Sequence, residues 1–159
     1  AAAVAPARKV GIGMSAIQHA VSELGYVEHR LEMKLHQDMV LIDDAFNANP
    51  EGAAAACDVL AQMPGWRILV TPGMIDLGEQ QEQFNRCLGM HAASCADEVI
   101  LVGGKQVQPL RQGLLEGGFD EDHIRQVMTM QEAFVCFEQS PHADKVVLIE
   151  NDVPDVLNR

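Results

Sequence analysis

The stretch that decides the fold runs from Arg67 to Gly104 and reads RILVTPGMIDLGEQQEQFNRCLGMHAASCADEVILVGG. Two short apolar segments, RILV at its start and EVILV from Glu98, are bounded by turn residues and polar residues, as buried strands are. Between them, apolar residues recur at helical spacing from about Glu79 onward. Strand, helix and strand in this order predict a βαβ unit, in which the two strands run parallel.

The same alternation continues toward the C-terminus. Apolar residues over 107–114 predict another helix, and a weak strand follows over 124–127. Thr129 and Glu132 form a capping-box pattern that begins a further helix, and KVVLI from Lys145 is the last strand. Apolar strands of this kind are buried on both faces. We therefore predict a Rossmann-like α/β fold, with a mostly parallel sheet and helices on both faces.

A helix and a β-hairpin are predicted ahead of this sheet. Apolar residues between Ile17 and Leu24 lie on one face of a short helix. Between Val27 and Ile42, apolar and charged residues alternate, and Gln37-Asp38 interrupts them where a hairpin would turn. Asn49 then has the form of an N-cap, with Pro50 at the first position of the next helix.

Composition excludes several classes of function. The 159 residues include 11 Lys plus Arg and 23 Asp plus Glu, a formal net charge of −12. This balance argues against a nucleic-acid partner and an anionic membrane, because phosphate binding needs a basic face, and no apolar run is long enough to span a bilayer. The four cysteines form no Cys-x-x-Cys pair, so we predict free thiols in a reducing cytoplasm and no metal site. His91 lies on the apolar stripe of its helix and is predicted to pack in the core.

Two segments contain residues suited to ligand chemistry: VEHRLEMK over 27–34 and LIDDAFNANPEG over 41–52. Arg30 begins the first predicted hairpin strand and Asp44 ends the second, so pairing of the strands brings them to the same edge. An arginine fork suits phosphate and a carboxylate suits ribose hydroxyls, so the pair suits a nucleotide. The same residues also fit an ordinary surface ion pair beside a helix cap, and the residues alone leave both interpretations open.

Four phrases in a fixed order resemble the C-terminal part of the Mur ligases: HRLE, DDAFNANP, VTPGMIDLGEQ and CADEVILVG. The Mur ligases are ATP-dependent enzymes that form amide bonds in peptidoglycan precursors. The similarity is greatest to the branch that joins D-alanyl-D-alanine to UDP-N-acetylmuramoyl-tripeptide, which ends in a phrase like ENDVPD over 150–155. The resemblance covers essentially the whole chain. It implies that residues 1–26 end a central ATPase domain and that residues 27–159 form the C-terminal domain.

The resemblance also implies roles for four residues. Arg30 matches the family arginine that reaches the ATP phosphates, and Asp44 matches the aspartate that approaches the ribose. Asn47 stands where relatives have His or Asn near the nucleotide. Glu79 matches a glutamate of the pocket for the incoming amino acid. Departures from the family pattern concern the identity of the incoming amino acid or dipeptide more than the ATP contacts. They are Phe46 in place of Tyr, Gly73 in place of Asp, and Asn85 in place of His.

By this resemblance, the chain belongs to a cytoplasmic enzyme in which a substrate carboxylate attacks ATP and an amine displaces the resulting acyl phosphate. The substrates would be ATP, a UDP-MurNAc-peptide and D-Ala-D-Ala. A central domain would supply most contacts to ATP and Mg²⁺, so the chain is expected to be a fragment that is inactive alone and that self-associates through exposed apolar surface. Two alternatives stay open: a non-catalytic α/β binding module, and another ATP-dependent amino-acid ligase of the superfamily, such as the folylpolyglutamate type.

Overall fold

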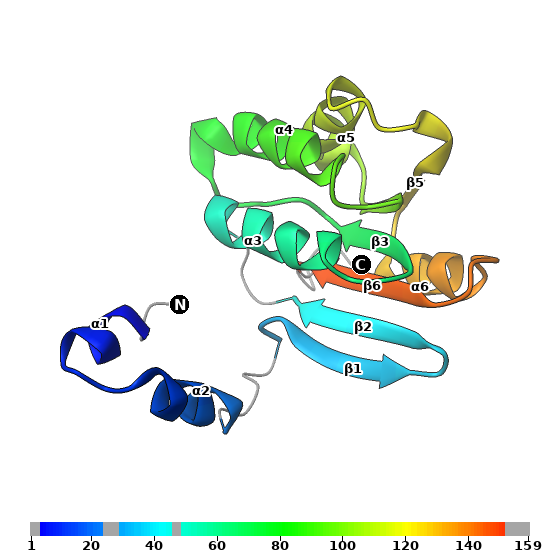
Figure 1. Ribbon diagram of the computed structural model, residues 1–159. Helices are drawn as coiled ribbons and strands as arrows, with labels where there is room; N and C mark the ends of the chain where they lie inside the picture. The colour runs from blue at the N-terminus through cyan, green and yellow to red at the C-terminus, as the bar shows by residue number, and fades with distance from the viewer. Residues whose placement is uncertain (1–3, 24–28, 46–48, 152–159) are drawn as a thin grey trace.

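A computed structural model describes residues 4–23, 29–45 and 49–151. Its strands form one six-stranded sheet in the order β1-β2-β6-β3-β4-β5 (Figure 1). The strands are β1 (Glu32–His36), β2 (Met39–Asp44), β3 (Trp66–Thr71), β4 (Glu98–Val102), β5 (Ile124–Val127) and β6 (Lys145–Glu150). The β1–β2 pair is antiparallel, and the other four pairs of this sheet are parallel. The predicted Rossmann-like sheet, preceded by a hairpin, is confirmed.

The helices follow the predicted alternation. The α-helices are α1 (Val4–Lys9), α2 (Met14–Ser22), α3 (Pro50–Ala61), α4 (Gln81–Ala92), α5 (Gln108–Glu116) and α6 (Met130–Glu138). Three short 3-10 turns are η1 (Gly78–Gln80), η2 (Lys105–Val107) and η3 (Glu121–His123). Two of the predicted helix starts are confirmed: the Asn49 side chain accepts a hydrogen bond from the Gly52 amide at 2.9 Å, and Thr129 and Glu132 form a complete capping box.

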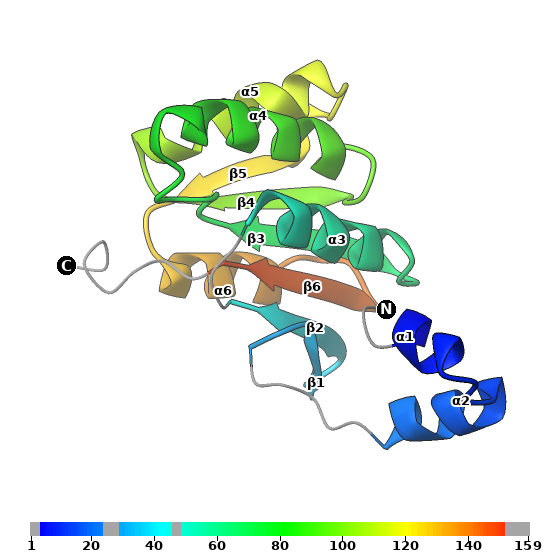
Figure 2. The ribbon, with the colours of Figure 1, turned by 90° about the vertical axis from the view of Figure 1, so that its left-hand side faces the viewer.

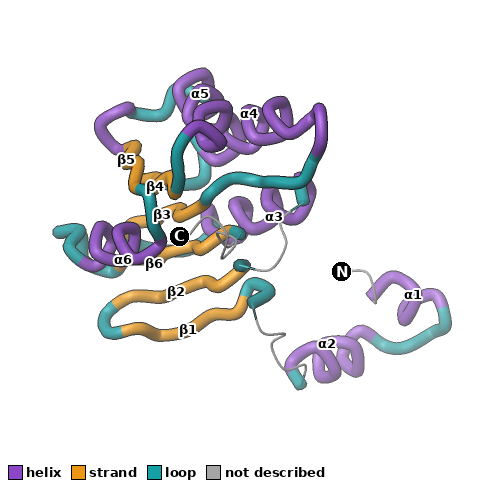
Figure 3. The backbone as a smooth tube through the Cα atoms, turned by 180° about the vertical axis from the view of Figure 1, so that it is seen from behind, coloured by secondary structure: helices purple, strands orange, loops and turns teal. Residues whose placement is uncertain are grey.

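Helices α3, α4 and α5 cover one face of the sheet, and α6 covers the other, as Figures 2 and 3 show from two further sides. On the first face, Leu60, Leu88 and Leu114 pack with inward-facing strand residues such as Leu69. On the second face, the side chain of Phe137 is fully buried against the alternate strand residues. Every residue of β4 is buried, because this strand has a neighbour on each side and a helix layer on each face.

The hairpin differs from its prediction in two ways. Its first strand begins at Glu32 and not near Val27, which lies outside the described residues, so Arg30 precedes the strand. The pattern predicts that the apolar residues of this strand are buried, but the opposite is found: the side chain of Met33 is 40% exposed and that of Leu35 is 87% exposed. Both side chains lie on the α3 face of the sheet, because they pair with Ile42 and Val40, but β1 is the edge strand of the sheet.

Helices α1 and α2 stand apart from the sheet (Figure 1). The sequence predicted α2 but not α1. Apolar side chains of this part, including Val10, Ile12 and Met14, are exposed. Self-association through such surface stays a prediction. In the described part of the chain, no helix has the length and apolar character needed to cross a membrane.

Candidate nucleotide-binding edge

The predicted site lies at the carboxyl end of β2, where Asp43 and Asp44 end the strand. Consecutive strand residues point to opposite faces of a sheet. Ile42 packs in the core beneath α3, whereas Leu41 packs on the α6 face, so Asp44 follows the α3 face and Asp43 the α6 face. The two neighbouring aspartates therefore have different surroundings and different partners.

Asp44 binds the backbone of the segment that precedes β1. Its Oδ1 accepts a hydrogen bond from the Leu31 amide at 3.1 Å. Burial raises the pKa of Asp44, and the Leu31 amide and the positive charge of Arg30 oppose that shift. Arg30 therefore lies at the same edge as Asp44, because the residue that follows it binds the Asp44 carboxylate, whereas a shared ligand role for the two residues stays a prediction.

Asp43 is the centre of a charged cluster on the other face. Its Oδ2 lies 3.0 Å from Lys34 Nζ and 2.9 Å from His29 Nδ1, and its Oδ1 accepts the Ala45 amide at 3.3 Å. Burial is the largest single influence on the pKa of Asp43 and would raise it, but the hydrogen bonds from Lys34, His29 and Ala45 together lower it. Asp43 is thus held as a carboxylate by its partners.

The backbone around Arg30 is unusual. His29 has φ of 57° and Leu31 has φ of 48°, so Arg30 stands between two non-glycine residues in the left-handed region. Each such residue costs about 1 to 3 kcal/mol, and such strain persists where the surrounding structure holds it. Here the hydrogen bonds to Asp43 and Asp44 hold both residues. The two aspartates therefore hold the residues on both sides of Arg30.

A cavity of about 340 Å³ opens beside this cluster. Asp43 and His29 form its polar side, and Phe134, Met130 and Ile149 are among the residues of its apolar side. An apolar wall next to charged groups is a usual environment for a small polar ligand with a flat apolar part.

The sequence-predicted site residues do not all share this edge. Arg30 and Asp44 come together, and Asn47 lies outside the described residues. Glu79 is exposed in η1 and lines a different, polar cavity of about 740 Å³ together with Lys105 and Arg111.

Sequence reasoning missed three residues of the edge: His29, Lys34 and Asp43. All three lie within the segments singled out by their chemistry. The alternation of strand faces was the signal that would have separated Asp43 from Asp44.

A second network closes the carboxyl edge between β3 and β6. Thr71 Oγ1 donates to Glu150 Oε2 at 2.9 Å and accepts from the Gly73 amide at 3.0 Å. Glu150 is 1% exposed and pairs across the sheet with Asp44. Burial, with a smaller contribution from the Asp44 charge, raises the pKa of Glu150 to about 7, although the Thr71 hydroxyl acts in the opposite direction.

Two of the departures from the family pattern contact each other in this network. Asn85 accepts the Met74 amide at 2.8 Å and donates to the Met74 carbonyl at 2.8 Å. Gly73 has φ of 76°, and a Cβ added there would lie 2.6 Å from Asn85 Oδ1. Asn85 thus occupies the space that a side chain at position 73 would need.

Comparison with known proteins decides the family. The model of the Mur ligase, glutamate ligase domain matches residues 29–154. The chain belongs to this family. The UDP-N-acetylmuramoyl-tripeptide–D-alanyl-D-alanine ligase of Escherichia coli is 37% identical over 106 residues, which are 66% of this chain and 24% of that protein. The resemblance to the Mur ligases drawn from the sequence is confirmed.

Solved Mur ligases share the fold. The MurF ligase of Thermotoga maritima in complex with ADP aligns with a TM-score of 0.75 at 18% identity, over 98% of this chain and 34% of that one. MurF from Acinetobacter baumannii aligns with a TM-score of 0.72 at 24% identity, over 94% of this chain and 33% of that one. The chain therefore spans about a quarter to a third of the length of these Mur ligases.

Proposed function

We propose that this chain is the C-terminal domain of an ATP-dependent ligase that joins D-Ala-D-Ala to a UDP-MurNAc-tripeptide. The name and identity of the Escherichia coli relative support the choice of substrates. We also propose that residues 1–26 end a preceding ATPase domain and that the protein is cytoplasmic. The separation of α1 and α2 from the sheet supports the division (Figure 1).

The observation that carries the proposal is that Arg30 and Asp44 lie at the same carboxyl edge of the sheet, where the amide of Leu31, the residue after Arg30, binds the Asp44 carboxylate. In open α/β sheets, ligands bind outside the carboxyl ends of the strands. The planar fork of Arg30 suits two phosphate oxygens, and the Asp44 carboxylate suits the hydroxyl groups of ribose. We propose that both contact ATP, with Asn47 beside them, when the domain closes over a nucleotide held by the preceding domain.

Mg²⁺ does not fit Asp43 and Asp44. The ion prefers an octahedral set of oxygen ligands. Asp43 instead faces two cationic partners, Lys34 and His29, and Asp44 has Arg30 close by. We propose that the preceding domain holds the ion. The part of this chain is to bind and orient the phosphates and the ribose.

We assign the incoming dipeptide to the polar cavity that contains Glu79. A dipeptide carries an ammonium group at one end and a carboxylate at the other. The lining of that cavity offers a carboxylate from Glu79 and a cation from Lys105, whereas the guanidinium of Arg111, which also lines it, is paired with Glu121. Opposite charges in one cavity suit a zwitterion, and this supports the assignment.

The proposal is tested with Arg30→Lys and Asp44→Asn in a protein that includes the preceding domain. Arg30→Lys keeps the charge but loses the planar fork, so kcat/KM for ATP is expected to fall about tenfold to a thousandfold, equivalent to about 1.4 to 4 kcal/mol. Asp44→Asn is expected to raise KM for ATP more than it lowers kcat, because it removes a binding charge. The chain of residues 1–159 alone is expected to have no ligase or ATPase activity.

Arg125→Lys is the matched control. Arg125 is half-exposed on β5, pairs with Glu98 and lies away from the proposed site. Melting temperatures of the same preparations separate a loss of fold from a loss of function. If Arg30→Lys leaves kcat/KM for ATP within about twofold of the parent while Arg125→Lys does the same, the nucleotide role of Arg30 is wrong.

A further inference from the structure

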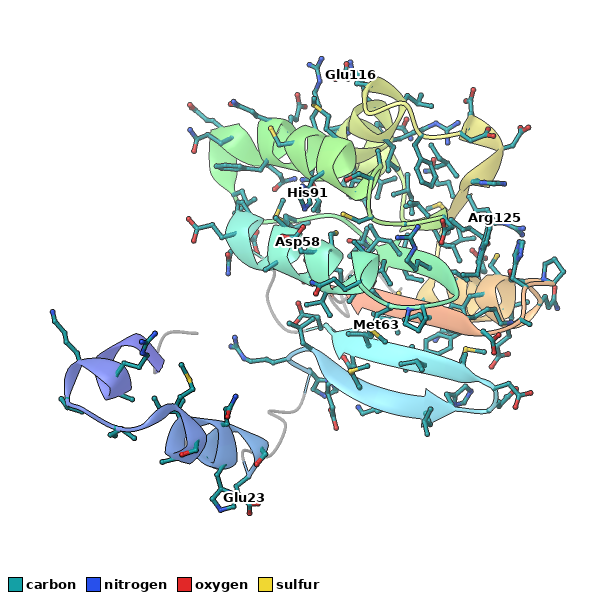
Figure 4. All side chains as sticks on the ribbon, viewed as in Figure 1. Glu23, Asp58, Met63, His91, Glu116 and Arg125 are labelled. Carbon is teal, nitrogen blue, oxygen red and sulfur yellow. The ribbon has the colours of Figure 1, made fainter. Side chains whose placement is uncertain are left out.

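A cluster of three different metal-ligating side chains joins α3 to α4. Asp58 belongs to α3, whereas His91 lies in the last turn of α4 and Cys95 follows one turn later. The three ligand atoms all lie within 4.8 Å of one another. His91 Nε2 is 2.8 Å from Asp58 Oδ1, and Figure 4 shows these two labelled side chains facing each other between the helices.

The position of His91 corrects the sequence prediction. His91 was expected to pack in the core, but its side chain is 39% exposed and meets Asp58. The side chain of Asp58 is 61% exposed, whereas Cys95 is 3% exposed. The cluster therefore has one buried sulfur and two ligands that open to solvent. No sequence motif indicated it, because Asp58 comes from a different helix, far from the other two along the chain.

We propose that Asp58, His91 and Cys95 bind a Zn²⁺ ion, with a water molecule as the fourth ligand. Zn²⁺ takes carboxylate, imidazole and thiolate ligands in tetrahedral sites, and a thiolate beside an imidazole favours it over Mg²⁺ or Ca²⁺. Because the side chains of Asp58 and His91 are exposed, the water can bind on the side of the ion that faces solvent. The net charge of −12 favours the approach of a cation.

The geometry needs only small movements. Zn–N and Zn–O distances of about 2.1 Å and a Zn–S distance of about 2.3 Å place tetrahedral ligand atoms about 3.4 to 3.6 Å apart. The His91–Asp58 pair at 2.8 Å must therefore open by about 0.6 Å. No two of the three ligand atoms are more than 4.8 Å apart, so the most distant two must approach each other by no more than about 1.4 Å. Changes of this size are within reach of side-chain rotations.

Without metal, the same groups satisfy one another. The His91–Asp58 contact bridges the helices, and Cys95 Sγ donates to the His91 carbonyl at 3.4 Å. Zn²⁺ would replace the direct contact between His91 and Asp58 by bonds to a shared ion.

The cluster lies away from the edge that we assign to the nucleotide. Helix α4 connects two neighbouring parallel strands and runs antiparallel to them, so its last turn lies at the amino edge of the sheet. Arg30 and Asp44 lie at the carboxyl edge. A metal at the amino edge therefore serves to fasten α3 to α4 and takes no part in the proposed reaction, and the inference holds or fails independently of that function.

Zn²⁺ binding to the full chain tests the inference, measured by competition with a chromophoric chelator. We expect one Zn²⁺ per chain with Kd of about 1 μM or below, and a melting temperature that rises with added Zn²⁺. Co²⁺ in place of Zn²⁺ is expected to give the visible absorption of a tetrahedral thiolate complex. His91→Gln and Cys95→Ser should each weaken binding by at least about tenfold, and Cys95→Ser should abolish the thiolate band.

Cys87→Ser is the matched control, because Cys87 is an exposed thiol on the same helix. It is expected to leave affinity and the Co²⁺ spectrum unchanged. His91 is half-exposed, so His91→Gln is expected to fold. It therefore still tests the inference if Cys95→Ser, which alters a buried side chain, does not fold. Binding that is absent, or that His91→Gln leaves unchanged, overturns the inference. So does binding that Cys87→Ser weakens as much as His91→Gln does.

Discussion

Replacement of Glu150 by glutamine should make the protein more resistant to alkaline pH. Glu150 is buried at the carboxyl end of β6, and burial raises its pKa from 4.5 to about 7. A carboxyl group whose folded pKa is raised stabilises the fold most below its unfolded pKa, and this stabilisation is lost as pH rises through the folded pKa. Between pH 5 and pH 8 the wild-type protein should lose about 2 to 3 kcal/mol through this group, because one pKa unit is worth about 1.4 kcal/mol.

The glutamine side chain of the Glu150→Gln variant carries no charge at either pH, and its amide oxygen still accepts from Thr71. The free energy of unfolding of this variant, relative to wild type, should therefore rise by about 2 to 3 kcal/mol from pH 5 to pH 8, or about 4 to 12 °C in melting temperature. Urea unfolding at several pH values measures it, with exposed Glu82→Gln as the control. A difference between the Glu150 variant and wild type that stays constant within about 0.5 kcal/mol over this range would refute the argument.

Two further predictions concern packing and helix ends. Gly89→Ala should destabilise the chain by about 3 kcal/mol or more, because an added Cβ would collide with the Leu110 carbonyl where α4 meets α5. Gly13→Ala is the control: a Cβ added there has no atom within 4 Å, so the melting temperature should change little. Thr129→Ala should cost about 1 kcal/mol in urea unfolding, because it removes the acceptor for the Glu132 amide, and no loss would contradict the capping role.

The sequence predicted the centre of the sheet well because the inner strands are short apolar runs that neither face exposes. The strand over 98–102 is of this kind, and every residue of it is buried. Helix starts were predictable where a side chain caps the backbone, as at Asn49 and Thr129. These signals are local, so one sequence is enough to detect them.

The hairpin was predicted less well because exposure depends on what covers each face. The alternation at Met33 and Leu35 indicated a strand correctly, but only the strand order reveals that α3 does not cover β1. The residues of the candidate site were likewise predictable only where local features bring them together. Arg30 and Asp44 come together through hairpin pairing, a local feature, whereas the contact of Asp58 with His91 depends on helices that are distant in sequence.

The close contact at Gly73 and Asn85 has a consequence for how this part of the protein can change over time. With Asn85 in place, any side chain at position 73 meets its amide oxygen, and the left-handed backbone there adds a strain of its own. Replacement of Asn85 removes the hydrogen bonds that hold the Met74 backbone. Neither substitution is therefore neutral by itself, and the order of mutations matters. A lineage that changes one of the two positions passes through a less stable protein until the other has changed as well.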